Sequence, residues 1–218
     1  KAIRKHPAFL PEMDHDALHQ YMQYAYIPAP LSIYKGIQKL SPGHLLTISL
    51  NDPAENMSLE SYWSLADVAA EAQQSPFSGT DTDALNELER VLAQSVKGQQ
   101  LSDVPLGAFL SGGIDSSLIV ALMQSQSSRP VNTFTIGFKE DAYNEAKFAS
   151  EVASHLGTNH NEIYVGANDV MDVIPSLPQL YDEPFADSSQ LPTFLVSQLA
   201  RKHVTVSLSG DAGDEIFG

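Results

Sequence analysis

The segment LSGGIDSS, residues 110–117, decides the fold class of this chain of 218 residues. It follows the apolar run 104–110 and precedes the helical pattern 114–123, so it joins a predicted strand to a predicted helix. Its glycines allow a sharp turn and a close approach to a ligand, its serine hydroxyls are donors, and the first N–H groups of the helix point the same way. The segment therefore predicts an anion-binding loop, with an ordinary serine-rich helix cap as the alternative.

Strand and helix patterns alternate around this loop. A helical stripe at 84–96 begins after Thr80 and Asp83, which resemble a capping box. The strands expected next are 104–110, 131–138, 161–165 and 204–208, and the helices between them are 114–123, 144–156, 170–177 and 190–202. Gly157 stands at a C-cap position and is expected to close the helix over 144–156. This alternation predicts an α/β fold with a doubly wound, mainly parallel sheet, in which ligands bind beyond the carboxyl ends of the strands.

The amino-terminal part follows a different pattern. Asp14 is a plausible N-cap for a helix over 15–26, and 33–40 and 44–50 form an expected β-hairpin around the turn 41–43. The stretch 51–82 is expected to be polar and irregular. We therefore predict one domain over 1–66, a linker over 67–82 and a second domain over 83–218.

Composition excludes several classes of function. The chain has 27 acidic and 12 basic residues, a formal charge of −15 that repels nucleic acid. It has no cysteine, and thus no disulfide and no thiolate nucleophile, and no apolar run of the length that crosses a membrane. We expect a cytoplasmic location and neither a nucleic acid nor a membrane as partner.

A second motif, SGDAGDE at 209–215, follows the predicted strand 204–208 and brings three carboxylates together. Parallel strands place their carboxyl ends at one edge of the sheet, so this motif should lie beside the first loop. The first loop also holds a carboxylate, Asp115, and a carboxylate beside phosphates requires a cation such as Mg²⁺. The alternative is a solvated acidic turn.

SGGIDSS resembles the PP-loop of the N-type ATP pyrophosphatases, which cleave ATP between its α and β phosphates. SGDAGDE resembles the loop that separates asparagine synthetase and β-lactam synthetase from the other members. YNEAKFASEVASHLGTNHNE, DEPFADSSQLPTFLVSQLARK, LSPGHLLTISL and SYWSL also resemble segments of glutamine-hydrolysing asparagine synthetases. The resemblance implies an adenine nucleotide alpha hydrolase-like fold, preceded by the tail of an Ntn-type glutaminase domain.

The resemblance implies that ATP activates the side-chain carboxylate of aspartate as an acyl adenylate, and that ammonia from glutamine then displaces AMP. ATP and Mg²⁺ are the implied cofactors, and a homodimer is the implied assembly of the full-length protein. The family's glutaminase uses an amino-terminal cysteine, and its synthetase domain contributes a lysine beyond SGDAGDE. We therefore expect the chain to be a fragment that is inactive alone.

The same resemblance implies the site residues. Asp115 and Asp214 would bind Mg²⁺, Asp211 takes the catalytic position, and Asp187 and Ser188 belong to a substrate-side loop that could equally be a simple capped turn. The implied ATP-binding residues are Leu110, Ser111, Gly112, Gly113, Asp115, Ser116, Ser117, Ile136, Gly137, Ser209 and Gly210.

Other readings stay open. The carboxylate substrate could be one other than aspartate, the chain could be another PP-loop synthetase such as an NAD or GMP synthetase, or it could bind nucleotide without catalysis. His160 and Glu162 could be a metal pair, but two groups alone make a poor site and a structural role is favoured. Tyr62 and Trp63 are expected to pack between domains.

Overall fold

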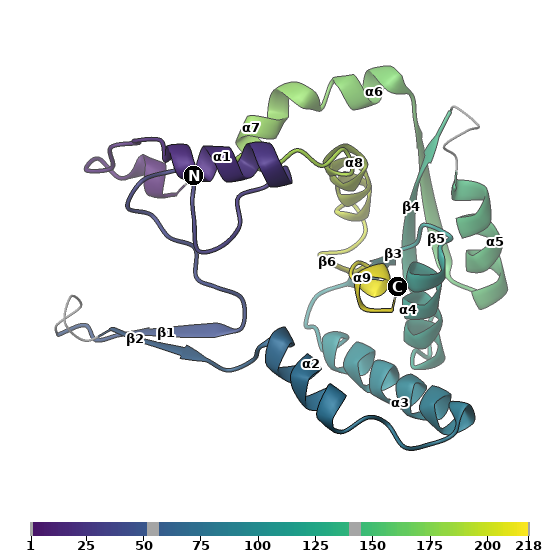
Figure 1. Cartoon of the computed structure of the whole chain (residues 1–218). Coiled ribbons are helices and arrows are strands. Elements are labelled where there is room, and N and C mark those ends of the chain that lie inside the picture. The colour runs from purple at the N-terminus through teal and green to yellow at the C-terminus, as the bar shows by residue number, and fades with distance from the viewer. Residues whose placement is uncertain (1, 52–56, 140–144, 218) are drawn as a thin grey trace. The chain divides into compact units, whose positions relative to one another are not determined.

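The structure, a computed structural model, describes residues 2–51, 57–139 and 145–217. The chain forms two compact units (Figure 1). Unit 1 consists of Lys1–Ser78 and Pro175–Asp187, and unit 2 of Gly79–Ile174 and Ser188–Gly218. Assignment of 175–187 to unit 1 was not foreseen from the sequence, and the predicted linker over 67–82 stays a prediction.

Unit 2 contains a four-stranded parallel sheet with the order β5-β4-β3-β6. Its strands are β3 (Leu106–Phe109), β4 (Asn132–Phe138), β5 (Asn159–Val165) and β6 (Val206–Leu208). Its helices are α3 (Asp81–Gln99), α4 (Ile114–Ser125), α5 (Ala146–Leu156), α6 (Ala167–Met171), α8 (Gln190–Ala200) and α9 (Gly213–Phe217). The predicted parallel α/β fold is confirmed.

Each face of the sheet packs against helices, because successive strand residues point to opposite faces. Ala108 and Leu110 join a core with residues of α3, α4 and α5, such as Val120 and Ala149. On the other face Phe134 is fully buried in a second core that includes Val196 of α8. The sheet is therefore covered on both sides, as the alternation of strands and helices predicted.

The local signals for helix ends are also confirmed in unit 2. Thr80 and Asp83 form the predicted capping box at the start of α3. Gly157 ends α5 in the left-handed region, with a φ of 72°. The predicted helix over 170–177 was wrong, because the chain there divides into α6, the short 3-10 turn η3 (Ile174–Ser176) and α7 (Leu177–Leu180). Pro175 and Pro178 lack the N–H that a continuous helix requires.

Unit 1 contains a 3-10 turn η1 (Ile3–Lys5), α1 (His15–Tyr24), the antiparallel pair β1 (His44–Ile48) and β2 (Met57–Ser61), α2 (Leu65–Gln74) and α7. Asp14 caps α1, since its carboxylate accepts hydrogen bonds from the N–H groups of Asp16 and Ala17. A small core of Ala17, Ile27 and Ile33 holds α1 against the loop that follows it.

The predicted hairpin had the wrong first strand. The strand at 44–48 pairs with 57–61 instead of 33–40. Residues 33–40 form turns, in which the backbone N–H of Lys35 donates to the Glu12 carbonyl and that of Lys39 to the Pro30 carbonyl, each at 2.9 Å. The stretch 51–82 is accordingly less irregular than expected, because it contains β2 and α2. All residues of β2 are exposed, although Met57 and Leu59 alternate with polar residues along the strand.

None of the helices among the described residues has the length and apolar character needed to cross a membrane.

Candidate nucleotide site

The loop after β3 has a conformation that only glycine adopts easily. Gly112 has a φ of 84°, and a Cβ built there would lie 2.7 Å from the backbone nitrogen of Ala149. The loop is also closed by its own hydroxyls: the Ser116 Oγ accepts a hydrogen bond from the Ser111 N–H at 3.1 Å and lies 2.8 Å from the Ser111 Oγ. Sequence, backbone and side chains therefore agree on one tight loop between β3 and α4.

The start of α4 supplies further donors at this loop. The helix is entered from Gly113, whose carbonyl accepts from the Ser117 N–H at 3.1 Å. The N–H groups of residues 114–116 come before this first helical bond and have no carbonyl of the preceding turn to meet. Such groups, with the positive end of the helix dipole, favour an anion.

The second motif lies against the first, as the sheet topology predicted. Strand β6 pairs with β3, and Leu208 stands beside Ala108. A Cβ on Gly210 would lie 2.6 Å from the Ser116 nitrogen, and one on Gly213 only 2.3 Å from the Asp115 Cγ. In the strand order β5-β4-β3-β6, the chain continues from β3 to β4 on one side, whereas β6 pairs with β3 on the other side. The two loops therefore meet where the strand order reverses, which is the usual ligand position in such sheets.

The carboxylates at this edge differ in environment. Asp115 is half-buried in the first turn of α4, and Asp211 and Asp214 are exposed. The Asp211 Oδ2 accepts a hydrogen bond from the Ser209 hydroxyl at 2.9 Å. Among the described residues, no group of three or more His, Asp or Glu side chains is placed to hold a metal ion by itself. A cation here would therefore need phosphate oxygens in addition to protein carboxylates.

Three of the implied ATP-binding residues, Leu110, Ile136 and Gly137, lie in the sheet or directly after one of its strands. The Leu110 N–H donates to the Phe134 carbonyl at 3.0 Å, and the Leu110 carbonyl accepts from the Thr135 hydroxyl. Ile136 and Gly137 lie further along β4, where the Tyr164 ring would stand 2.7 Å from a Cβ on Gly137. The second lone pair of the Leu110 carbonyl is the group that this residue has left to offer a ligand.

Ser117 is placed differently from Ser111 and Ser116. Its buried Oγ has no hydrogen-bond partner among the described residues, and Ser117 lines a hollow between α4 and α5 together with Leu118, Ala121, Glu151, Val152, His155 and Leu156. Of the proposed substrate-side residues, Asp187 ends unit 1 and Ser188 begins the last stretch of unit 2. The roles implied for all three residues stay predictions.

His160 and Glu162 take part in a polar row on the edge strand β5. The Thr133 Oγ1 lies 2.9 Å from the Thr158 Oγ1 and 2.8 Å from the His160 Nδ1, and the Tyr164 hydroxyl donates to Glu162 at 2.8 Å. The His160 Nε2 is 3.3 Å from the Glu162 Oε1 without hydrogen-bond geometry. Burial lowers the pKa of His160, and the Glu162 carboxylate raises it by less.

Sequence reasoning missed the threonines of this row, because a lone Thr on a strand carries no pattern. No further metal ligand joins His160 and Glu162 in the described part of the chain, and the structural role favoured for the two residues stays a prediction.

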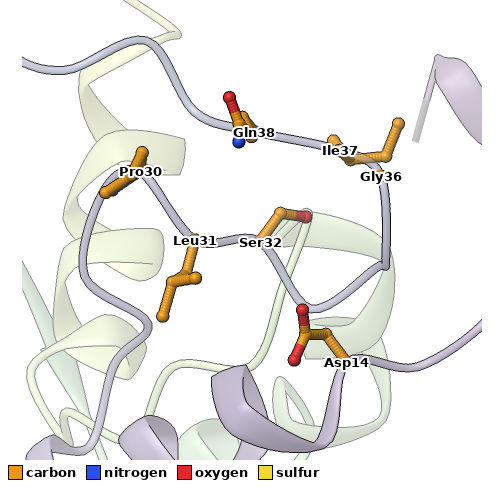
Figure 2. A pocket seen from close by; sticks show the side chains of 7 residues that line it. All are labelled: Asp14, Pro30, Leu31, Ser32, Gly36, Ile37 and Gln38. Carbon is orange, nitrogen blue, oxygen red and sulfur yellow. The ribbon is translucent and has the colours of Figure 1, made fainter.

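Unit 1 has a separate cavity of about 250 Å³ enclosed by the loop 30–38 and the start of α1 (Figure 2). Its lining residues are Asp14, Pro30, Leu31, Ser32, Gly36, Ile37 and Gln38. The Asp14 Oδ1 already caps α1, and the Ser32 hydroxyl accepts from the Tyr34 N–H at 3.3 Å. The Asp14 carboxylate and the Ser32 hydroxyl are thus engaged in bonds within unit 1.

Two parallel strands that end in adjoining glycine-rich loops, one with hydroxyls and both with carboxylates, define a nucleotide-binding α/β protein. Residues 87–218 match the family model described as asparagine synthase, and residues 1–63 match that of the glutamine amidotransferase domain. The chain belongs to the asparagine synthase family.

Similar proteins carry the same description. Asparagine synthetase (glutamine-hydrolysing) 1 of Bacillus subtilis is 33% identical over 207 residues, which are 95% of this chain and 31% of that protein. A Methanocaldococcus jannaschii protein whose name assigns it to the same class is 38% identical over 204 residues, 93% of this chain and 38% of that protein. The chain thus spans about a third of the length of these relatives.

Among solved structures, an NH3-dependent NAD synthetase from Campylobacter jejuni matches with a TM-score of 0.42 and 13% identity, over 61% of this chain and 60% of that one.

Proposed function

We propose that the chain is the nucleotide-activating part of a glutamine-dependent asparagine synthetase. In this reaction a carboxylate oxygen of aspartate attacks the α-phosphorus of ATP, the bond from that phosphorus to the bridging oxygen breaks, and pyrophosphate leaves. Ammonia from glutamine then attacks the acyl carbon, AMP leaves, and the nitrogen loses a proton. Relatives with this enzyme's name at 33–38% identity and the match to the asparagine synthase model support the proposal.

The observation that carries the proposal is the contact between the two loops. A Cβ on Gly210 would lie 2.6 Å from the Ser116 nitrogen, and a Cβ on Gly213 would lie 2.3 Å from the Asp115 Cγ, so only glycine fits at these positions. Adenylylation needs one site that holds pyrophosphate and exposes the α-phosphorus at its edge. An anion-binding loop pressed against an acidic loop, at the carboxyl ends of parallel strands, is suited to this task.

Each proposed group has a chemical role. The hydroxyls of Ser111 and Ser116 and the N–H groups of 114–116 would hold the departing pyrophosphate. Asp115 and Asp214 offer the hard oxygen donors that Mg²⁺ prefers beside phosphates, so the donor set fits this ion. When bound, Mg²⁺ neutralises phosphate charge. Asp211 is exposed and ionisable, and we propose that it accepts the proton lost by the attacking nitrogen.

We further propose a cytoplasmic homodimer for the complete protein, with aspartate or a related carboxylate and glutamine-derived ammonia as its substrates.

Exchange of labelled pyrophosphate into ATP tests the proposal on the complete protein that carries this sequence. Exchange should require aspartate and Mg²⁺, and Asp115→Asn should lower it by about 100-fold, as removal of a main electrostatic contact does. Exchange that depends on another carboxylate would assign another substrate. Binding of AMP without any exchange would instead favour a non-catalytic nucleotide module.

A further inference from the structure

Lys39 joins three segments of unit 1. Its ammonium group donates to the Ile27 carbonyl and to the Glu183 carboxylate. The Lys39 side chain is 34% exposed and the Glu183 side chain 27%. Its backbone N–H also donates to Pro30 O at 2.9 Å, which fixes the base of the side chain at the end of the loop shown in Figure 2. A half-buried cation with a carbonyl and a carboxylate as acceptors is held more firmly than an exposed pair.

This contact connects the two family segments of the chain. Lys39 lies within residues 1–63, which match the amidotransferase model, whereas Glu183 lies within 87–218, which match the synthase model. A second connection runs beside it, because the Ala186 N–H donates to the Ala25 carbonyl at 2.9 Å. The rings of Tyr181 and Phe185, 5.6 Å apart, add packing within the same loop. A synthase segment is therefore anchored on the amidotransferase segment.

The anchored loop leads directly to the proposed substrate-side residues. Glu183 and Ala186 are held in unit 1, and the chain passes from Asp187 to Ser188 into the last stretch of unit 2. Loss of the contact between Lys39 and Glu183 would remove one of the bonds that hold the loop, beside the bond of Ala186 to Ala25. The backbone of Asp187 and Ser188 would then sample more conformations, at a cost in substrate binding and with no direct effect on the reacting atoms.

We propose that Lys39 is a positioning residue for the synthetase reaction, which holds the loop 182–188 through Glu183 and thereby links the amidotransferase segment to the carboxylate substrate site. This inference rests on the proposed function. It differs from a role in nucleotide binding, since no residue of the two glycine-rich loops takes part in it.

The chain offers a matched control pair. Lys35 and Glu12 also form an ion pair, 2.5 Å long, but their side chains are 51% and 69% exposed and both lie within the amidotransferase segment. Lys35→Ala removes the same charge as Lys39→Ala without touching the loop 182–188. An effect of total charge or of surface ion pairs in general would appear in both variants.

Kinetics with ammonia in place of glutamine test the role in the complete protein. In Lys39→Ala and Glu183→Gln, the KM for aspartate should rise about fivefold or more, the lower end of coupling between sites, and kcat should change less than about twofold. Lys39→Arg should keep most of the function, and the exchange Lys39→Glu with Glu183→Lys should recover part of it. An unchanged KM for aspartate, or an equal rise in Lys35→Ala, would overturn the proposal.

Hydrogen exchange provides a readout that does not depend on activity. The Ala186 amide should exchange about fivefold faster or more in Lys39→Ala than in the wild type, and at the wild-type rate in Lys35→Ala. Equal exchange in the wild type and Lys39→Ala would overturn the anchoring role. A wild-type protein that shows the protected Ala186 amide but no aspartate-dependent reaction would contradict the proposed function alone.

Discussion

Gly213 lies so close to Asp115 that a Cβ on the glycine would fall 2.3 Å from the Asp115 Cγ and 2.5 Å from its Oδ2. Two residues almost a hundred positions apart in the chain thus form one surface, where the loop after β6 closes on the start of α4. The neighbour that would have to move is the carboxylate that we propose as a Mg²⁺ ligand.

Gly213→Ala should therefore weaken Mg·ATP binding by about tenfold, or about 1.4 kcal/mol, because it displaces the Asp115 carboxylate. Gly98→Ala is the control, since a Cβ at Gly98 meets nothing within 4 Å. Titration calorimetry of both variants with Mg·ATP measures the difference. Equal affinities in Gly213→Ala and Gly98→Ala would contradict the loss of Mg·ATP binding through displacement of the Asp115 carboxylate.

Asp115→Asn and Asp214→Asn should reduce affinity for Mg·ATP much more than for metal-free AMP, by about tenfold or more, since a carboxylate near phosphates is favourable only with a cation between them. Asp103→Asn is the matched control, as this exposed residue precedes β3 and so lies toward the opposite end of the strand. Equal losses for the two ligands, measured by calorimetry with and without Mg²⁺, would argue against metal binding.

Gly112→Ala should destabilise unit 2 by about 2–4 kcal/mol, since it combines a left-handed backbone with a steric clash. Its φ is 84°, and the new Cβ would lie 2.7 Å from the Ala149 nitrogen. Gly157→Ala separates the two causes, because Gly157 has a φ of 72° but nothing within 4 Å of its Cβ position. Urea unfolding should show a loss of only about 1 kcal/mol in that control. Similar losses in both variants would mean that the loop yields at no steric cost.

The sequence was most informative where local chemistry and the tertiary fold agree. The capping box at Thr80 and the glycine at 157 marked helix ends without reference to the rest of the chain. The rule that parallel strands bring their following loops to one edge then placed SGGIDSS beside SGDAGDE. The two loops approach closely because Gly210 and Gly213 have no side chains where they meet the start of α4. No sequence pattern predicts how close this approach is.

The prediction was weakest where long-range contacts override local preference. Residues 33–40 are β-rich in composition, yet Gly36 takes a φ of 73° and the backbone bonds to Glu12 and Pro30 make turns. Strand β2 is defined only by its pairing with β1, since all its side chains are exposed. Likewise the pair of Lys39 and Glu183 spans more than half of the chain, so no local pattern could identify it.

The last prediction concerns the dependence of stability on pH. Burial lowers the pKa of His160 below its ordinary value of 6.5 in the folded protein. As the pH falls below about 6.5, the unfolded chain takes up a proton at this residue before the folded protein does, so it binds more protons and gains stability relative to the fold. The contribution of His160 to the free energy of unfolding is thus present above pH 6.5 and decreases as the pH falls toward the folded pKa.

His160→Gln should remove this part of the pH dependence, although it also costs about 1 kcal/mol at pH 7.5 through the bond between His160 and Thr133. Urea unfolding of the wild type and the variant at pH 7.5, 6.5 and 5.5, about one unit apart, measures how the free energy of unfolding changes with pH. His155→Gln, at an exposed position of α5, is the control for loss of a histidine. The prediction is contradicted if all three proteins, the wild type, His160→Gln and His155→Gln, lose the same free energy of unfolding between about pH 7.5 and 5.5. Burial in the fold would then not keep His160 neutral.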